Sequence, residues 1–290
     1  MYYGWQPYYP MESMPRLPVL LLALCTALPA DPIGEVFQRL YNFDFPSAHS
    51  VLDRHLDAQP DDPMGHSTRA AVLLFYELDR LGILEAELFA DDRRLTDDKK
   101  KLRPDPDVRT RFFGAVETAQ SRAQSVLATR PSDPDALYAL CMSQGLVVDY
   151  TALIDKKNMA SLSLAKRANA CAQRLLKEHP NVHDAYVTVG FTEYLVGSLP
   201  FFVRWFVRFD GVEGSKRQGI RVLQQASQSG RYLGPFAKIL LAVAWLREKN
   251  PHESRRLLAE FNRDYPGNQL VRRELDKLSE RLSPGAASSP

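Results

Sequence analysis

Apolar residues along most of the chain recur three and four positions apart, the spacing that forms one face of an α-helix. Two stretches repeat a tighter pattern that ends at Pro131 and at Pro180: two alanines lie four residues apart, two bulky apolar residues follow, and the proline comes four residues later. Proline ends a helix, and the Asp133 and Asn181 that follow suit the N-terminal cap of the next one. The pattern therefore predicts helices that follow one another in hairpins.

The predicted fold class is all-α. Glycine is scarce, at 15 residues, and no β-branched alternation indicates strands. The expected paired helices span 32–43 with 46–58, 62–87 with 108–130, 134–149 with 158–178, 183–196 with 214–229, and 235–248 with 251–264, followed by a single helix over 268–282. A helical bundle without repeats is the alternative.

Small residues also recur at a fixed distance from the prolines. Ala70, Cys141 and Gly190 each lie ten residues after a proline. This spacing resembles the tetratricopeptide repeat (TPR), a 34-residue helix–turn–helix. The resemblance covers most of residues 32–282, and the uneven proline intervals indicate insertions. It implies an α-solenoid of about five TPR-like hairpins, a C-terminal capping helix and a role in binding proteins.

The resemblance also implies which residues line the concave face of the solenoid. The candidate contacts for a protein or peptide partner are Tyr138, Met142, Phe191 and Tyr194. The inward positions carry no Lys, Arg or Asn, so we do not expect the clamp that holds C-terminal carboxylates in some TPR proteins. An apolar groove suits a peptide helix or strand, or is filled by an insertion, and the filled groove is the preferred interpretation.

Residues 1–30 are predicted to be a signal peptide with an upstream extension. Arg16 precedes an apolar run from Leu17 to Leu28, which is too short to span a membrane, since a span needs ~20 residues. We therefore expect export to the bacterial periplasm or cell envelope, with a buried N-terminal helix as the alternative. Lipid attachment at Cys25 is disfavoured, because the large Leu24 precedes it.

Two insertions interrupt the predicted solenoid, and residues 283–290 are predicted to form a disordered tail. The first insertion, 88–107, has runs of mixed charge typical of a solvated loop, with a docking site as the alternative. The second, 197–213, is rich in aromatic residues. Its candidate membrane or partner contacts are Phe201, Phe202, Trp205, Phe206, Arg204 and Arg208. A helix that plugs the solenoid core is the preferred interpretation, and an interfacial membrane helix is the alternative.

A second, weaker resemblance covers about 30 residues near this insertion. Leu199-Pro200, followed by the spacing of Gly214, Lys216 and Gly219, resembles a segment of the eukaryotic inclusion-clearance family of TPR-like solenoids. The resemblance implies the same architecture and nothing further.

The balance of charge narrows the class of partner. Lys and Arg number 37 against 35 Asp and Glu, so no excess of positive charge favours nucleic acid as a partner.

Outside the predicted signal peptide, Cys141 and Cys171 form no CxxC motif. They are interpreted as two buried thiols, and a disulfide in an exported protein is the alternative.

No pattern in the sequence indicates catalysis. HExxH, GxSxG, the phosphate-binding P-loop and GxGxxG are all missing from the sequence. His179 and His183 have the spacing of metal ligands on a helix, but Pro180 separates them at a predicted turn. We therefore expect no catalytic residues, no metal and no cofactor. The predicted function is a non-catalytic, exported interaction scaffold, and the alternative is a peripheral membrane protein that docks through residues 200–209.

Overall fold

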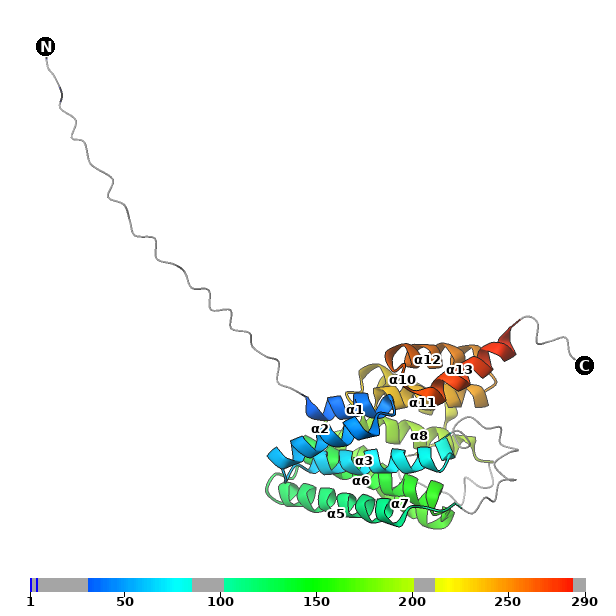
Figure 1. The fold of residues 1–290 in the computed structure, drawn as a ribbon, viewed down its shortest axis with the longest axis horizontal. Coiled ribbons are helices and arrows are strands. Elements are labelled where there is room, and N and C mark those ends of the chain that lie inside the picture. Colours follow the sequence, from blue (N-terminus) through cyan, green and yellow to red (C-terminus); the bar gives the residue numbers. More distant parts are fainter. Residues whose placement is uncertain (2–3, 5–30, 85–101, 201–211, 284–290) are drawn as a thin grey trace, which may run out of the picture. The chain divides into compact units, whose positions relative to one another are not determined.

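The computed structural model describes residues 31–84, 102–200 and 212–283, together with Met1 and Gly4. Over these ranges the chain forms helices and no strand (Figure 1). The predicted signal peptide, the aromatic residues 201–209 and residues 284–290 lie outside the described residues, as does most of the first insertion. Residues 31–290 form one unit and residues 1–30 another, and the fold below is that of the first.

The helices keep the labels of Figure 1. Their bounds are α1 (Pro32–Tyr41), α2 (Phe45–Ala58), α3 (Pro63–Arg80), α5 (Pro106–Thr129), α6 (Pro134–Asp149), the π-helical η1 (Tyr150–Ile154), α7 (Asn158–Glu178), α8 (Ala185–Ser198), α10 (Lys216–Ser229), α11 (Gly234–Arg247), α12 (Pro251–Asp264) and α13 (Gln269–Leu282).

The predicted fold class is confirmed, because successive helices pack in pairs and each pair packs against the next. The pairs are α1–α2, α3–α5, α6–α7, α8–α10 and α11–α12, and α13 follows on α12. The described chain is thus an α-solenoid of five TPR-like hairpins with a C-terminal helix. The predicted helix over 62–87 was too long: α3 ends at Arg80, because Gly82 adopts a positive φ of 69° in the turn that follows.

Aspartates begin several of these helices, as the sequence pattern predicts. The side chains of Asp44, Asp62, Asp105 and Asp133 each accept a hydrogen bond from a backbone N–H in the first turn of the next helix. A proline fills an early position in each of these helices, where its missing N–H costs nothing. Local sequence therefore fixes where these hairpin helices start.

The cysteine interpretation was wrong, because the structure pairs Cys141 of α6 with Cys171 of α7 in a disulfide. Antiparallel packing of the hairpin brings their Cα atoms to 5.4 Å, within the usual range for a disulfide. Two residues 30 positions apart thus meet at the same height of one hairpin, which residue spacing alone does not reveal.

Helix α6 packs against α3, α5 and α7. Together with η1, it is the one helix of the described residues that is long and apolar enough for a membrane span, with a mean hydropathy of 1.4. Of that window, 56% is buried inside the protein, and Cys141 ties the helix to α7. We therefore interpret Pro134–Ile154 as a core helix.

Buried glutamates hold the second helix of the two hairpins that carry insertions. The fully buried Glu77 of α3 accepts a hydrogen bond of 2.7 Å from the backbone N–H of Asp105, just before α5. Glu193 of α8 likewise accepts hydrogen bonds from the backbone N–H groups of Glu213 at 3.2 Å and Ser215 at 2.8 Å, just before α10. A carboxylate on the preceding helix therefore fixes the C-terminal end of each insertion through hydrogen bonds to its backbone.

Helices α8 and α10 approach each other closely at Gly219. A Cβ atom at Gly219 would lie 2.5 Å from the backbone nitrogen of Tyr194 and 2.7 Å from the carbonyl oxygen of Gly190. Both neighbours are backbone atoms, so the helices themselves would have to move apart. The glycine in the resemblance to the inclusion-clearance family therefore has a packing role here.

Replacing Gly219 with alanine is expected to lower the free energy of unfolding by about 2 kcal/mol, in the range typical of overpacked sites. Gly114 of α5 is the matched control, because a Cβ atom there meets nothing within 4 Å. Gly114→Ala should raise stability by roughly 0.5–1 kcal/mol through helix propensity. Urea unfolding followed by circular dichroism measures both, and equal stability of the two variants would contradict the close approach.

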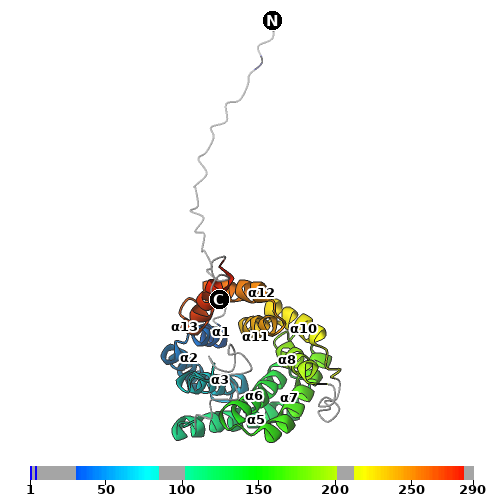
Figure 2. The same ribbon diagram turned by 90° about the vertical axis from the view of Figure 1, so that its right-hand side faces the viewer.

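The last helices of the solenoid return to the first, so that α13 lies beside α1 (Figure 2). The hydroxyl of Tyr41 donates a hydrogen bond of 2.7 Å to the carbonyl oxygen of Tyr232, and the side chain of Asn268 donates one of 2.9 Å to the carbonyl oxygen of Tyr41. The backbone N–H of Gly267 donates to the side chain of Asn42 at 2.9 Å. We call this contact of residues 31–42 with residues 231–271 the seam.

Candidate partner-binding surface

The four predicted groove residues lie at the predicted first helices of their hairpins, but three of them are buried. Tyr138, Met142 and Tyr194 are 7%, 8% and 2% exposed, whereas Phe191 is half-buried. Further round the solenoid, the rings of Phe75 on α3 and Phe236 on α11 meet edge to face at 5.7 Å. The inner faces of these helices therefore contact one another, and a partner-binding role of the four residues stays a prediction.

Tyr194 connects three helices. Its hydroxyl lies 3.2 Å from a carboxylate oxygen of Glu248 and 3.3 Å from the carbonyl oxygen of Ala244, and Lys216 forms an ion pair of 2.8 Å with the same glutamate. Burial, and then the nearby Glu248 carboxylate, raise the pKa of Tyr194 to about 12. The residue is thus a neutral packing group between α8, α10 and α11.

Tyr138 belongs to a column of aromatic rings that crosses the seam. The ring of Tyr232 stacks on Phe37 of α1 at 5.3 Å and on Tyr138 of α6 at 6.3 Å. The turn that carries Tyr232 is held by Asp184, whose buried carboxylate accepts hydrogen bonds from the backbone N–H groups of Tyr232 and Leu233 at 3.0 Å. Burial raises the pKa of Asp184, and these donors oppose that effect.

An open hollow of about 290 Å³ lies at the seam between α1 and the turn before α11. We call it the seam hollow. The polar side chains that line it are Asp31, Glu35, Gln38, Arg231, Tyr232 and Tyr265. Phe37 and Tyr41 supply apolar walls. The hollow is therefore formed by both ends of the solenoid and exists only when the seam is closed.

Charge favours the closure of the seam. Residues 31–84 contain nine acidic and four basic residues, whereas residues 212–283 contain eight acidic and fourteen basic residues. Arg231 forms an ion pair of 2.9 Å with Asp31, and its guanidinium lies 4.8 Å from the centre of the Tyr232 ring. On α3, burial raises the pKa of Asp79 and the nearby Arg273 of α13 opposes it. The two ends attract each other, and salt screens that attraction.

Sequence reasoning missed the seam hollow, because its walls come from residues about 200 positions apart. The available signal was the opposite charge of the two ends of the chain. The six aromatic and arginine candidates Phe201, Phe202, Arg204, Trp205, Phe206 and Arg208 lie outside the described residues.

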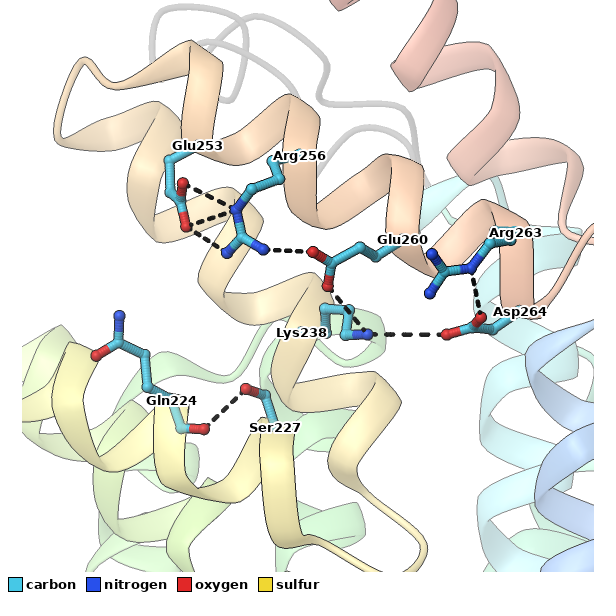
Figure 3. A network of polar contacts seen from close by, with 8 residues as sticks. All are labelled: Gln224, Ser227, Lys238, Glu253, Arg256, Glu260, Arg263 and Asp264. Atoms are coloured by element: carbon cyan, nitrogen blue, oxygen red, sulfur yellow. Dashed lines mark hydrogen bonds and ion pairs between the residues drawn. The ribbon is translucent and has the colours of Figure 1, made fainter.

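A second group of polar side chains joins α11 to α12 (Figure 3). Lys238 lies 3.5 Å from Glu260 and 3.8 Å from Asp264, and Arg256 pairs with Glu253 and Glu260. Each charge in this network has an opposite neighbour, and exposed pairs of this kind contribute only about 0–1 kcal/mol each. The network therefore links the two helices of the last hairpin. Together with Arg263, which lies 3.2 Å from Asp264, it has three positive and three negative side chains and no net charge to attract a ligand.

The described residues contain no group of three or more His, Cys, Asp or Glu side chains that could hold a metal ion. The ring of His179 donates a hydrogen bond of 2.7 Å to the carbonyl oxygen of Ser132, in the turn before α6. This histidine therefore has a local structural contact between neighbouring hairpins.

Comparison of the sequence with protein-family models and with curated proteins gives no match. Among solved structures, a thermophilic TPR protein from Thermus thermophilus is similar in fold, with a TM-score of 0.47 and 13% sequence identity. The similarity covers 86% of this chain and 97% of that one. At this identity the likeness concerns the fold alone.

Proposed function

We propose that this protein is a non-catalytic scaffold that binds a protein or peptide partner at its helical surface. The seam hollow carries the proposal: it is open, it has the size of a small binding site, and it combines aromatic walls with polar side chains of both signs. The predicted inner face offers less surface, since of the four predicted groove residues only Phe191 is half-exposed. Partner binding therefore centres on the seam.

Export to the periplasm or cell envelope is part of the proposal. The disulfide between Cys141 and Cys171 supports it, because such bonds persist in oxidising compartments and are rare where thiols are kept reduced. The apolar run before residue 30 supports it independently. Membrane docking through residues 200–209 and the resemblance to the inclusion-clearance family stay predictions.

Quantitative affinity capture tests the scaffold. The purified protein, a Glu35→Ala/Gln38→Ala variant of the seam hollow and an exposed Glu117→Ala control on α5 are each incubated with envelope extract. At least one protein should be recovered about tenfold less by the hollow variant and equally by the control. Equal recovery of every protein by all three would contradict partner binding at the seam.

A further inference from the structure

Two tyrosines that line the seam hollow have hydroxyl groups without a good hydrogen-bond partner. Tyr232 is 8% exposed and Tyr265 is 7% exposed. The hydroxyl of Tyr232 lies 3.5 Å from a carboxylate oxygen of Asp31, and the side-chain nitrogen of Gln38 lies 3.5 Å from the hydroxyl of Tyr265. Hydrogen bonds are usually shorter, at about 2.5–3.0 Å for an O–H donor and about 2.7–3.2 Å for an N–H donor. Both side chains line the hollow, and both hydroxyl groups make long hydrogen bonds that a ligand could replace with shorter ones.

The charge around the hollow favours a cation. Asp31 and Glu35 supply two partly exposed carboxylates, of which Asp31 pairs with Arg231 at 2.9 Å and Glu35 pairs with the exposed Arg39 at 3.3 Å. Arg231 is the single basic side chain in the lining that the structure describes, and it is already engaged with Asp31 and the ring of Tyr232. Asp135 of α6 adds negative charge close to Arg231. An incoming anion would meet these carboxylates, whereas a cation can compete with Arg39 for Glu35, because an exposed ion pair contributes only about 0–1 kcal/mol.

The size of the hollow is sufficient for one long side chain. Its volume of about 290 Å³ lies at the lower end of the range of ligand pockets, which is about 300–1,000 Å³. Carboxylates beside aromatic rings recognise ammonium and guanidinium groups through charge-assisted hydrogen bonds and contact with ring faces. The N–H groups of such a cation can also donate to the two tyrosine oxygens.

We propose that the seam hollow binds the side chain of a lysine or arginine in the partner, an inference that rests on the proposed scaffold function. The Glu35 carboxylate pairs with the cationic group, and Tyr232 and Tyr265 accept its remaining hydrogen bonds. Because the hollow is formed by both ends of the chain, binding also favours the closed seam.

Titration of the purified protein with blocked amino acids, followed by NMR, tests this proposal. N-acetyl-arginine amide and N-acetyl-lysine amide should produce saturable shifts at the side-chain amide of Gln38 and the backbone amide of Tyr232. The neutral isostere N-acetyl-citrulline amide and the anionic N-acetyl-glutamate amide should not.

Glu35→Gln should weaken binding of the arginine probe about tenfold, as expected for the loss of one charge-assisted contact. Glu35 pairs with the exposed Arg39 on its own helix, so this variant should fold normally. Tyr265→Phe keeps the ring and should weaken binding about threefold, whereas Glu117→Gln should not change it. Citrulline that binds as well as arginine, or an unchanged dissociation constant in Glu35→Gln, would overturn the cation site. If capture succeeds while the arginine probe fails, the scaffold stands and the ligand class is wrong.

Discussion

Replacing Asp184 with alanine should lower the free energy of unfolding by about 3 kcal/mol. The carboxylate is 3% exposed and is the acceptor for the backbone N–H groups of Tyr232 and Leu233. Its loss leaves both donors unsatisfied in a buried turn, at about 1–3 kcal/mol for each group. The same turn carries the ring that stacks on Phe37. Urea unfolding measures the loss, and hydrogen exchange in α1 should rise as the seam loosens.

The exposed Asp57 near the end of α2 provides the control for this substitution. Asp57→Ala should change stability by no more than about 0.5 kcal/mol, as is usual for surface positions. Asp184→Asn retains one acceptor oxygen and should fall between the two. A loss below about 1 kcal/mol for Asp184→Ala, the lower bound for one unsatisfied donor, would mean that the turn before α11 keeps its conformation without the carboxylate, and the account of the seam would fail.

Removing the disulfide between Cys141 and Cys171 should lower the free energy of unfolding by about 3 kcal/mol. The bond closes a loop with a sequence separation of 30, and cross-links of this length restrict the unfolded chain by about 3–4 kcal/mol. A Cys141→Ser/Cys171→Ser variant and the wild-type protein are compared by urea unfolding without reductant. Adding reductant should bring the wild-type protein down to the level of the variant and leave the variant unchanged.

The redox state of the same pair in cells tests the compartment. Alkylation of thiols in intact cells, followed by mass spectrometry, should find Cys141 and Cys171 protected until reductant is added. Two freely alkylated thiols would count against both the disulfide and export. Loss of the bond with normal export would show that the hairpin packing of α6 and α7 alone holds the core.

The seam changes how the solenoid is expected to work. In an open solenoid each terminal hairpin has one unpartnered side, and a capping helix with a polar outer face covers it. Here α13 follows α12 and also contacts the N-terminal part of the chain, where Leu270 and Val271 are buried. We therefore place the proposed binding surface where the two ends meet rather than in the inner groove.

The sequence by itself determined the class of the fold and most of its helices. Prolines and capping aspartates mark the helix starts locally, so the five hairpins could be placed to within a few residues. The local pattern predicted the end of α3 too far along the chain. The helix ends early because Gly82 adopts a positive φ in the turn that follows. The π-helical turn of η1 gave no signal in the spacing of apolar residues.

Only the tertiary structure decided which side chains are buried and which residues from distant parts of the chain meet. The resemblance to the TPR assigns Tyr138 and Tyr194 to an inward face, but their burial depends on which helix lies opposite, and that depends on how far the solenoid turns. The seam hollow depends on the same rotation, since Asp31 meets Arg231 across the whole chain. The disulfide depends instead on the packing within one hairpin, where Cys141 meets Cys171. Small rotations between successive hairpins add up over the solenoid, and packing geometry sets them rather than any local motif.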